Sequence, residues 1–329
     1  MSERICVVIG GSGYIGGFLI RDLIEQGVFA RIYNFDLRNR DFGDPKVIFR
    51  QVDVRKPIDA DPGAFDPEES WLYNLAALCR EPGSEPHEYF DTNVGGAENV
   101  AAYAEARGFR NLFFTSTMSS YGRMLHPTPE TAPQYPETPY GISKAIAERI
   151  HRAWHAAGSG RRRLVICRPS VIFGPGDREN IPRMLRAVKK GYFVFPGSPG
   201  IVKGYGYVFG LVESMRFVTA RRDESVIIYN YAERDCLPLS GMVRTMREFY
   251  GKKVIALRIP LSFLVAVSYL FLALGRIRGR RFAIHPVRVR KVAFPTNLKP
   301  QYLIDKGFAF RYPLEKALEH WRSIAPGEF

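Results

Sequence analysis

Short apolar runs alternate with amphipathic stretches through the first half of the chain. Because each run has the length of a strand and each amphipathic stretch can cover it, the pattern predicts an α/β fold with a doubly wound parallel sheet. Strands are expected at residues 5–9, 31–35, 47–52, 71–75, 112–115 and 164–167. Helices are expected at residues 14–26, 87–107 and 140–157.

The alternation breaks at Asn180, after which proline, glycine and aromatic residues become frequent. We therefore expect residues 1–179 to form the main sheet domain and residues 180–329 to form mostly a smaller C-terminal lobe. The two parts are interleaved, because residues 226–230 again have the pattern of a strand. Segments near 202–232 are expected to complete the sheet.

The segment 259–275 contains no charged residue and lies between Arg258 and Arg276. A membrane-spanning helix needs about 20 apolar residues, and this segment is shorter and carries Pro260. We expect a buried helix. The alternative is a helix that lies on a membrane surface, with peripheral contact through residues 259–281 and their arginines.

The chain of 329 residues carries a net charge of +14, and many of its late cations are arginines. Such charge suits diphosphates or anionic lipid. No nucleic-acid-binding motif accompanies it, so nucleic acid is not an expected partner. The four cysteines are scattered without metal-ligand spacing, which predicts no metal site. The first apolar run leads into a glycine loop rather than a signal peptide, which predicts a cytoplasmic protein, with membrane association as the alternative.

Gly10, Gly13 and Gly16 follow the first expected strand and open the first expected helix. Glycines at this spacing permit a tight turn and close backbone approach, and the helix N-terminus offers N–H groups to a pyrophosphate. The motif predicts a Rossmann-type dinucleotide site that also includes Ser12, Tyr14 and Ile15.

Asp36 ends the second expected strand, twenty residues after Gly16. A carboxylate there can accept hydrogen bonds from the adenosine ribose hydroxyls and repels a 2′-phosphate, which favours NAD. Arg38 and Arg40 follow directly and could instead hold a 2′-phosphate, so NADP stays the alternative.

Tyr140 and Lys144 are four residues apart at the start of an expected helix, so they share one face. An ammonium group near a phenol lowers the phenol pKa, which suits tyrosine for proton transfer. Thr117 lies just beyond the fifth expected strand, at the sheet edge where ligands bind, and its hydroxyl can donate to a reacting oxygen. These three residues are the expected catalytic set.

Together these motifs resemble the extended short-chain dehydrogenases, the family of UDP-galactose 4-epimerase and many sugar-nucleotide reductases. The resemblance extends over most of the chain and includes residues 74–77, 92–96 and 168–176. It implies that Asp53 and Val54 contact the adenine and that Asn93 supports the central helix. Further cofactor contacts are implied for Leu75, Ala76, Ala77, Thr115, Ser116, Tyr140, Lys144, Pro169 and Val171.

The resemblance also bears on the substrate. Met118 and Ser119 stand where 4,6-dehydratases carry an Asp-Glu pair, so dehydration is not expected. Val171 replaces the asparagine usual in galactose-type epimerases. The substrate residues implied beside Thr117 are Met118, Ser119, Asn180, Arg183, Lys203 and Arg288.

We therefore expect an NAD(P)-dependent oxidoreductase or epimerase that transfers hydride to or from a nucleotide-activated sugar. C4 reduction of a keto sugar nucleotide is favoured over 4-epimerisation. A hydroxysteroid-dehydrogenase-like enzyme with a lipophilic substrate and a non-catalytic NAD(P) sensor are alternatives of other classes. The family further implies a homodimer formed through the helices at 87–107 and 140–157.

Overall fold

The computed structural model describes residues 3–80, 83–158, 160–277, 289 and 294–329. Its centre is a seven-stranded sheet in the order β11-β7-β5-β4-β1-β2-β3. All neighbouring strands are parallel, which confirms the predicted fold class. The strands are β1 Ile5–Ile9, β2 Arg31–Asp36, β3 Val47–Gln51, β4 Trp71–Asn74, β5 Asn111–Thr115, β7 Arg163–Pro169 and β11 Val226–Tyr231.

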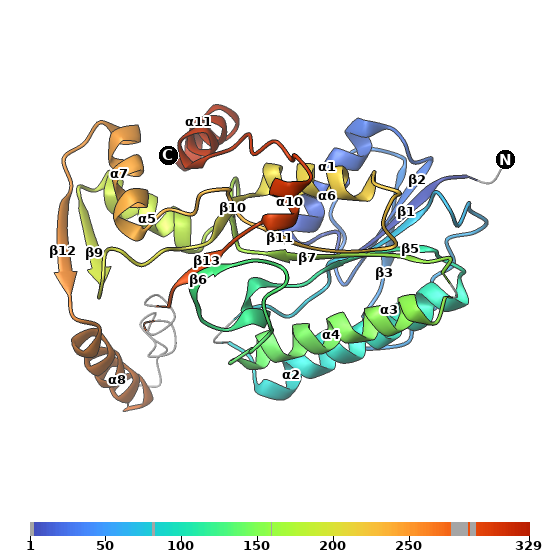
Figure 1. The fold of residues 1–329 in the computed structure, drawn as a ribbon, viewed down its shortest axis with the longest axis horizontal. Helices are drawn as coiled ribbons and strands as arrows, with labels where there is room; N and C mark the ends of the chain where they lie inside the picture. The colour runs from blue at the N-terminus through green and yellow to red at the C-terminus, as the bar shows by residue number, and fades with distance from the viewer. Residues whose placement is uncertain (1–2, 81–82, 159, 278–288, 290–293) are drawn as a thin grey trace.

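Helices cover both faces of the sheet (Figure 1). This cover is needed because successive apolar side chains of a strand point to opposite faces of the sheet. Cys6 and Val8 of β1 pack with Leu19 of α1 (Tyr14–Gln26) and Leu211 of α6 (Val208–Thr219). Val7 belongs to the core on the opposite face, together with α3 (Gly96–Ala106) and α4 (Pro139–Ala156). Both faces of each central strand are therefore buried.

The helix predicted at residues 87–107 is a composite. It consists of α2 (Pro86–Phe90), a π-helical turn (Asp91–Gly95) and α3. The π turn widens one helical turn, and such turns are frequent at functional sites. Asn93, a predicted site residue, lies in it.

The strand order reverses between β1 and β4, because β2 and β3 are added on one side of β1 and β4, β5 and β7 on the other. Ligands of open parallel sheets bind beyond the carboxyl ends of the strands at this switch point. The glycine loop after β1 and the segment after β4 both start there.

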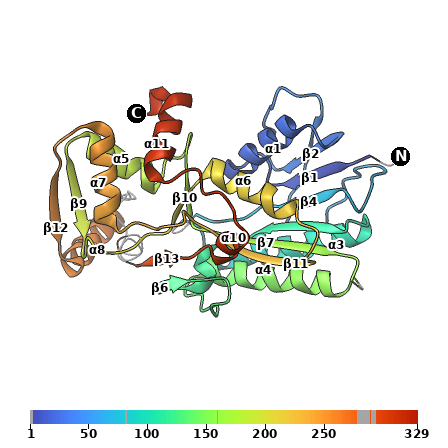
Figure 2. The same ribbon diagram turned by 45° about the horizontal axis from the view of Figure 1, so that its top comes forward.

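The C-terminal lobe has a core of its own, which includes Leu185, Phe195, Met246 and Trp321. Figures 1 and 2 show it beyond one end of the sheet. Its elements are α5 Asn180–Lys189, β9 Tyr192–Pro196, α7 Leu239–Tyr250, β12 Ile255–Ile259, α8 Leu261–Ile277 and α11 Leu314–Ile324. Short connecting elements are β6 Met124–Thr128, β8 Val171–Phe173, β10 Tyr205–Tyr207, β13 Thr296–Leu298, α10 Gln301–Asp305 and the 3-10 turns Met118–Tyr121 and Pro326–Glu328.

The expectation that residues 259–275 form a buried helix is wrong. These residues form the end of β12 and most of α8, and α8 lies on the surface with Phe263 58% and Leu270 59% exposed. The apolar composition indicated burial, but several described side chains of α8 are exposed in the folded lobe. Within the described part of the chain, every helix is too short or too polar to traverse a bilayer.

Candidate active site

The glycine loop between β1 and α1 is held in close backbone contact with the segment after β4. Gly10 has φ +83°, and a Cβ there would lie 2.7 Å from the backbone nitrogen of Ala76. A Cβ on Gly16 would collide with the carbonyl oxygen of Gly10. Leu75 donates a backbone hydrogen bond of 2.9 Å to Ile9, which continues the pairing of the strands. Larger residues would therefore close the cradle at the N-terminus of α1.

Asp36 lies at the carboxyl end of β2 and faces the glycine loop. Its carboxylate accepts hydrogen bonds from the backbone nitrogens of Ser12, at 3.0 Å, and Arg38, at 3.3 Å. The Ser12 hydroxyl donates to the Arg38 carbonyl at 2.7 Å. Arg40 reaches the same loop, where Nη1 donates to the Gly13 carbonyl at 3.3 Å.

Asn34 contacts the glycine loop and was not predicted from the sequence. This residue is buried in β2, and its Nδ2 donates to the Ser12 hydroxyl at 3.0 Å. A Cβ on Gly11 would lie 2.5 Å from Asn34 Oδ1, so the amide sets the position of the loop. The available signal was a polar residue inside an otherwise apolar strand.

Three buried hydroxyls, at the start of α1 and at the carboxyl ends of β5 and β7, are candidates for contacts with a ligand. The Tyr14, Thr115 and Ser170 hydroxyls are buried and have no hydrogen-bond partner among the described residues. The Tyr14 hydroxyl lies 3.1 Å from the place that a Cβ on Gly174 would occupy. Since buried polar groups are normally paired, these hydroxyls are suited to bind a polar ligand. Ile15 instead packs against the α1–α6 core.

The adenine contacts implied for Asp53 and Val54 remain predictions. The Asp53 carboxylate forms an ion pair of 2.7 Å with Arg55, whose hydrogen bonds lower the Asp53 pKa. The Val54 carbonyl accepts a hydrogen bond of 2.8 Å from Asn99. A Cβ on Gly96 would lie 3.0 Å from the Val54 side chain, so Val54 supports the start of α3.

Asn93 connects the segment after β4 to α4. Its Oδ1 accepts from the Leu78 backbone nitrogen at 2.8 Å. Its Nδ2 lies within hydrogen-bond distance of the Leu78 carbonyl, at 3.1 Å, and the Ser143 hydroxyl, at 2.9 Å. Leu78 follows Ala77 in the segment after β4, and Ser143 lies between Tyr140 and Lys144. The π turn thus presents one amide to both parts of the predicted site.

The first turn of α4 packs directly on the segment that carries Thr117. Thr138 caps this helix by accepting a hydrogen bond of 3.1 Å from the Gly141 nitrogen. A Cβ on Gly141 would lie 2.5 Å from the Ser119 carbonyl oxygen. Thr117 is the N-cap of the 3-10 turn Met118–Tyr121. Its side-chain oxygen accepts a hydrogen bond of 3.1 Å from the Ser119 backbone nitrogen. Glycine therefore lets Tyr140 approach the turn with Thr117, Met118 and Ser119.

Lys144 is almost wholly buried, with its Nζ 4.1 Å from the centre of the Phe114 ring. Burial lowers the Lys144 pKa to about 7, against the opposing effects of Cys79 and Glu148. Burial and the nearby Lys144 lower the His151 pKa to about 3, so this imidazole is neutral at physiological pH. Asn74 Nδ2 lies 3.1 Å from His151 Nε2. Helix α4 thus carries two buried nitrogen bases, Lys144 with a pKa of about 7 and His151, which is neutral at physiological pH.

A buried ion pair beneath the site was not predicted from the sequence. Arg168 Nε lies 2.9 Å from Glu148 Oε1, and Nη2 lies 2.6 Å from Oε2. Ser116, predicted to bind the cofactor, donates its hydroxyl to the same carboxylate. Arg168 also donates to the Tyr121 hydroxyl at 2.7 Å. The only sequence signal was an arginine at the end of an apolar strand run.

The remaining predicted residues lie toward the C-terminal lobe. Pro169 ends β7 opposite Tyr231 of β11, and Val171 starts β8. Asn180 begins α5, and Arg183 pairs with Glu179 at 3.0 Å on the surface.

Lys203 donates its Nζ to the Phe294 carbonyl, and burial lowers the Lys203 pKa to about 8. Arg288 lies outside the described residues. Met118 and Ser119 lie in the 3-10 turn that follows Thr117. The substrate roles of Met118, Ser119, Asn180, Arg183 and Lys203 remain predictions.

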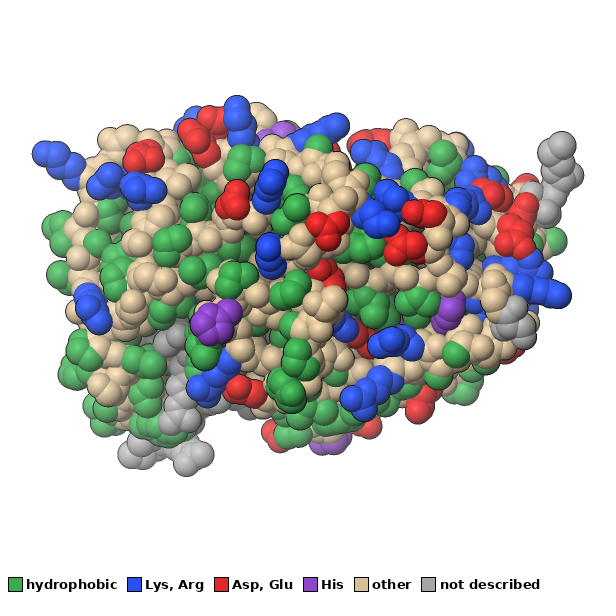
Figure 3. Space-filling model, in the orientation of Figure 1, with side chains coloured by type: hydrophobic (Ala, Val, Ile, Leu, Met, Phe, Trp, Pro, Cys, Tyr) green, Lys and Arg blue, Asp and Glu red, His purple; other side chains and the backbone are tan. Residues whose placement is uncertain are grey.

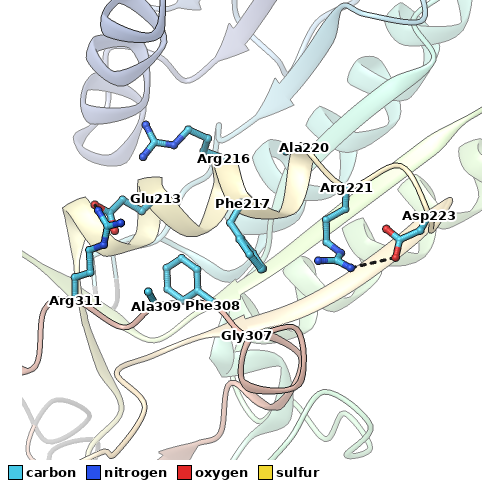
Figure 4. Close-up of a pocket in the computed structure, with 10 residues that line it drawn as sticks. All are labelled: Glu213, Arg216, Phe217, Ala220, Arg221, Asp223, Gly307, Phe308, Ala309 and Arg311. Carbon is cyan, nitrogen blue, oxygen red and sulfur yellow. Dashed lines mark hydrogen bonds and ion pairs between the residues drawn. The ribbon is translucent and has the colours of Figure 1, made fainter.

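A separate groove lies between α6 and the segment 307–311 (Figure 4). Its described lining includes Arg216, Phe217 and Phe308 but none of the predicted site residues. An ion pair of 3.1 Å joins Arg221 and Asp223 at one end. Because α6 and α4 cover opposite faces of the sheet, this groove is separate from the predicted catalytic residues on α4.

Residues 6–232 match the family model of the NAD dependent epimerase/dehydratase family. The chain belongs to this family. The match confirms the resemblance and supports NAD, the cofactor favoured by Asp36, over NADP.

Individual relatives extend beyond the matched residues. The chain is 29% identical over 319 residues to N-acetyl-alpha-D-glucosaminyl-diphospho-ditrans,octacis-undecaprenol 4-epimerase of Escherichia coli O157:H7, covering 97% of this chain and 94% of that protein. It is 26% identical to the decarboxylating sterol-4-alpha-carboxylate 3-dehydrogenase of Saccharomyces cerevisiae, covering 87% of each chain. The solved structure of MoeE5 in complex with UDP-glucuronic acid and NAD superposes with a TM-score of 0.71 at 19% identity, covering 98% of this chain and 99% of that one. This last similarity shows the fold.

Proposed function

We propose that the protein is an NAD-dependent 4-epimerase that acts on a sugar carried by a diphosphate, with a polyprenol as the preferred carrier. The observation that carries the proposal is the close contact of Gly141 with Ser119, which joins the Thr117 turn to the helix bearing Tyr140 and Lys144. These are the groups needed to move a proton at a carbinol oxygen. The end-to-end similarity to an undecaprenol-diphosphate-sugar 4-epimerase supports epimerisation over the C4 reduction favoured by the sequence.

In this proposal Tyr140 takes the proton from the C4 hydroxyl as the carbon is oxidised and returns it when the carbon is reduced. Thr117 donates a hydrogen bond to the same oxygen and so fixes its position. NAD, when bound, supplies the hydride acceptor and donor. Since both the proton and the hydride return to the sugar, the reaction has no net change in redox state.

Lys144 controls the charge near Tyr140. Its ammonium form stabilises a phenolate and lowers the phenol pKa. The Lys144 pKa of about 7 in the protein alone makes this charge sensitive to small changes in its surroundings. A bound ligand that contributes polar or anionic groups raises the Lys144 pKa and favours the charged form.

The orphan hydroxyls of Tyr14, Thr115 and Ser170 support a polar ligand that spans the cradle and reaches the edge of the C-terminal lobe. Arg183 and Lys203 are candidates for the diphosphate, as the sequence predicts. The homodimer implied by the family also remains a prediction.

Redox stoichiometry tests this proposal. The purified protein is incubated with N-acetylglucosaminyl-diphospho-undecaprenol in detergent micelles, and in parallel with UDP-N-acetylglucosamine. Released sugars are resolved as C4 epimers, and NADH is followed by absorbance. Conversion to the 4-epimer without net NADH formation supports the proposal, and faster conversion of the lipid-linked substrate supports the polyprenol carrier.

Other outcomes would contradict it. Stoichiometric NADH consumption with a 4-keto sugar would establish C4 reduction instead. Net NADH formation with a 3β-hydroxysteroid would favour the lipophilic-substrate alternative, which the sterol dehydrogenase relative supports. NAD binding without turnover of any of these compounds would favour a sensor.

A further inference from the structure

Among the described residues of the C-terminal lobe, β9, β12 and α8 carry a group of exposed apolar side chains. We call it the β9–β12–α8 face, and its exposed side chains are Tyr192, Ile255, Leu257, Phe263, Tyr269 and Leu270. Figure 3 shows hydrophobic side chains gathered over this end of the molecule, where Figure 1 places β9, β12 and α8. Exposed apolar patches of this kind mark interaction sites.

In the two-stranded part of this face, β9 has one buried side, whereas β12 is exposed along most of its length. Phe193 and Phe195 of β9 are buried in the core of the lobe. Their neighbours along the strand point the other way, where Tyr192 pairs with Ile255 of β12. Ile255 is 70% exposed. A ribbon exposed to water is expected to be polar on that side, and this one is apolar.

Helix α8 likewise exposes apolar side chains where polar ones are expected. Its exposed positions among the described side chains are Ser262, Phe263, Ala266, Tyr269 and Leu270. They follow the spacing i, i+1, i+4, i+7 and i+8, so they form one stripe along the helix. The stripe that faces water is thus apolar, whereas a surface helix usually exposes its polar side. The hydroxyl of Ser268 is not exposed and donates within the helix to Val265 at 2.6 Å.

The charge of this region is uniformly positive. The sequence contains no Asp or Glu between Glu248 and Asp305. Lys252 and Lys253 precede β12, and Arg258 lies near its end, all three exposed. Positive side chains beside an apolar surface complement an anionic bilayer, since the apolar groups enter the interface and the cations meet lipid headgroups.

We propose that the β9–β12–α8 face docks the protein on an anionic membrane leaflet, with α8 lying in the plane of the interface. Phe263 and Leu270 enter the acyl boundary, and Tyr269 lies at the headgroup level, where aromatic side chains with a polar tip are favoured. The helix does not cross the bilayer. This inference rests on the exposed face alone and does not require the proposed epimerase activity.

Binding of the full-length protein to vesicles tests the proposal. Sucrose-loaded vesicles of phosphatidylethanolamine and phosphatidylglycerol, and vesicles of phosphatidylcholine alone, are sedimented with wild-type protein, Leu270→Glu or Ile324→Glu. Ile324, on α11, is 49% exposed, so its substitution gives the same charge change at another exposed apolar position. Melting temperatures establish that both variants fold.

The wild type and Ile324→Glu are expected to bind the anionic vesicles, less strongly at high salt and more weakly to phosphatidylcholine. Leu270→Glu is expected to lower the partition coefficient about tenfold or more, because it removes one inserted side chain and adds a negative charge. Equal binding of the two variants, or no binding of the wild type, would overturn the proposal. The proposal would also be overturned if the wild type were an oligomer that does not bind vesicles and Leu270→Glu were a monomer. The face would then be the contact with a second copy of the chain.

Turnover of a water-soluble nucleotide sugar separates this proposal from the proposed function. Leu270→Glu is expected to keep wild-type turnover of any such substrate. Vesicle binding by a protein without epimerase activity would refute the proposed function alone, whereas epimerisation without vesicle binding would refute the docking proposal alone.

Discussion

Arg168 and Glu148 form a bidentate ion pair in the interior, with nitrogen–oxygen distances of 2.9 and 2.6 Å. The pair joins β7 to α4, one turn beyond Lys144, and both side chains are almost fully buried. Burial alone would lower the Arg168 pKa, but its hydrogen bonds and charge interaction with Glu148 outweigh that effect and raise it. The two residues hold α4, which carries Tyr140 and Lys144, against the end of the sheet.

Removal of one partner of this pair is expected to be costly, because it leaves the other charge buried and unpaired. We expect Arg168→Leu to lower the free energy of unfolding by about 3–5 kcal/mol. The matched control is Arg183→Leu, which breaks the exposed pair with Glu179 and is expected to cost at most about 1 kcal/mol. Urea unfolding of both variants measures the difference. Similar losses of unfolding free energy in the two variants would show that the buried pair stabilises the protein no more than the exposed pair.

The Tyr140 hydroxyl is the proposed proton carrier. We expect Tyr140→Phe to lower kcat about 100- to 10,000-fold, the usual contribution of general acid–base catalysis, while NAD still binds. Tyr135→Phe, at an exposed tyrosine, is the control and should keep wild-type kcat. Turnover and NAD titration are measured on the same preparations. Near-normal kcat in Tyr140→Phe would remove the proposed acid/base.

Gly141 allows the contact between the first turn of α4 and the Ser119 carbonyl. A methyl group at position 141 would force these segments apart, so Gly141→Ala is expected to lower kcat about tenfold to a hundredfold. Gly95→Ala serves as the control, because Gly95 is also helical and a Cβ there meets open space. That control should keep its activity and match or exceed wild-type stability. Equal kcat for the two variants would contradict the role of the contact.

Asp36 is the expected ribose ligand and also accepts from the Ser12 nitrogen. We expect Asp36→Ala to weaken NAD binding and to narrow the preference for NAD over NADP about tenfold, since the repulsive carboxylate is gone and Arg40 stays at the loop. Asp41→Ala, at an exposed position, is the control. Titration with both cofactors gives the ratio, and an unchanged ratio would refute the ribose assignment.

Glu233 is buried beside the backbone nitrogen of Tyr207, at 3.4 Å, and burial raises its pKa to about 8. The folded protein therefore holds a proton that the unfolded chain releases between about pH 4.5 and pH 8, so stability falls as the pH rises through this window. Glu233→Gln should remove this loss and stabilise the protein at pH 8 by about 1 kcal/mol or more. Urea unfolding at pH 5 and pH 8 is the measurement.

The exposed Asp235→Asn is the control for this experiment and should leave the pH dependence unchanged. A wild-type protein whose stability does not fall between pH 5 and pH 8 relative to Glu233→Gln would contradict the buried, protonated state of Glu233.

The sequence alone was sufficient for the central sheet and for the place of the glycine loop between β1 and α1. Strands β1, β2, β4, β5 and β7 follow from apolar runs, because a strand buried on both faces must be apolar along its whole length. The places of Asp36 at the end of β2 and of Tyr140 and Lys144 in the first turns of α4 follow from spacing, whereas their functional roles stay predictions.

Only the tertiary structure decided the contacts between distant segments. The Arg168–Glu148 pair and the closeness of Gly141 to Ser119 join segments that have no periodic relation in the chain, so no local pattern predicts them. Helix α8 shows most clearly what the sequence leaves open, because its apolar composition is compatible both with a buried helix and with a helix at a membrane interface. Its exposure depends on how many neighbouring elements the lobe can place around it, and among the described residues one stripe of the helix stays exposed.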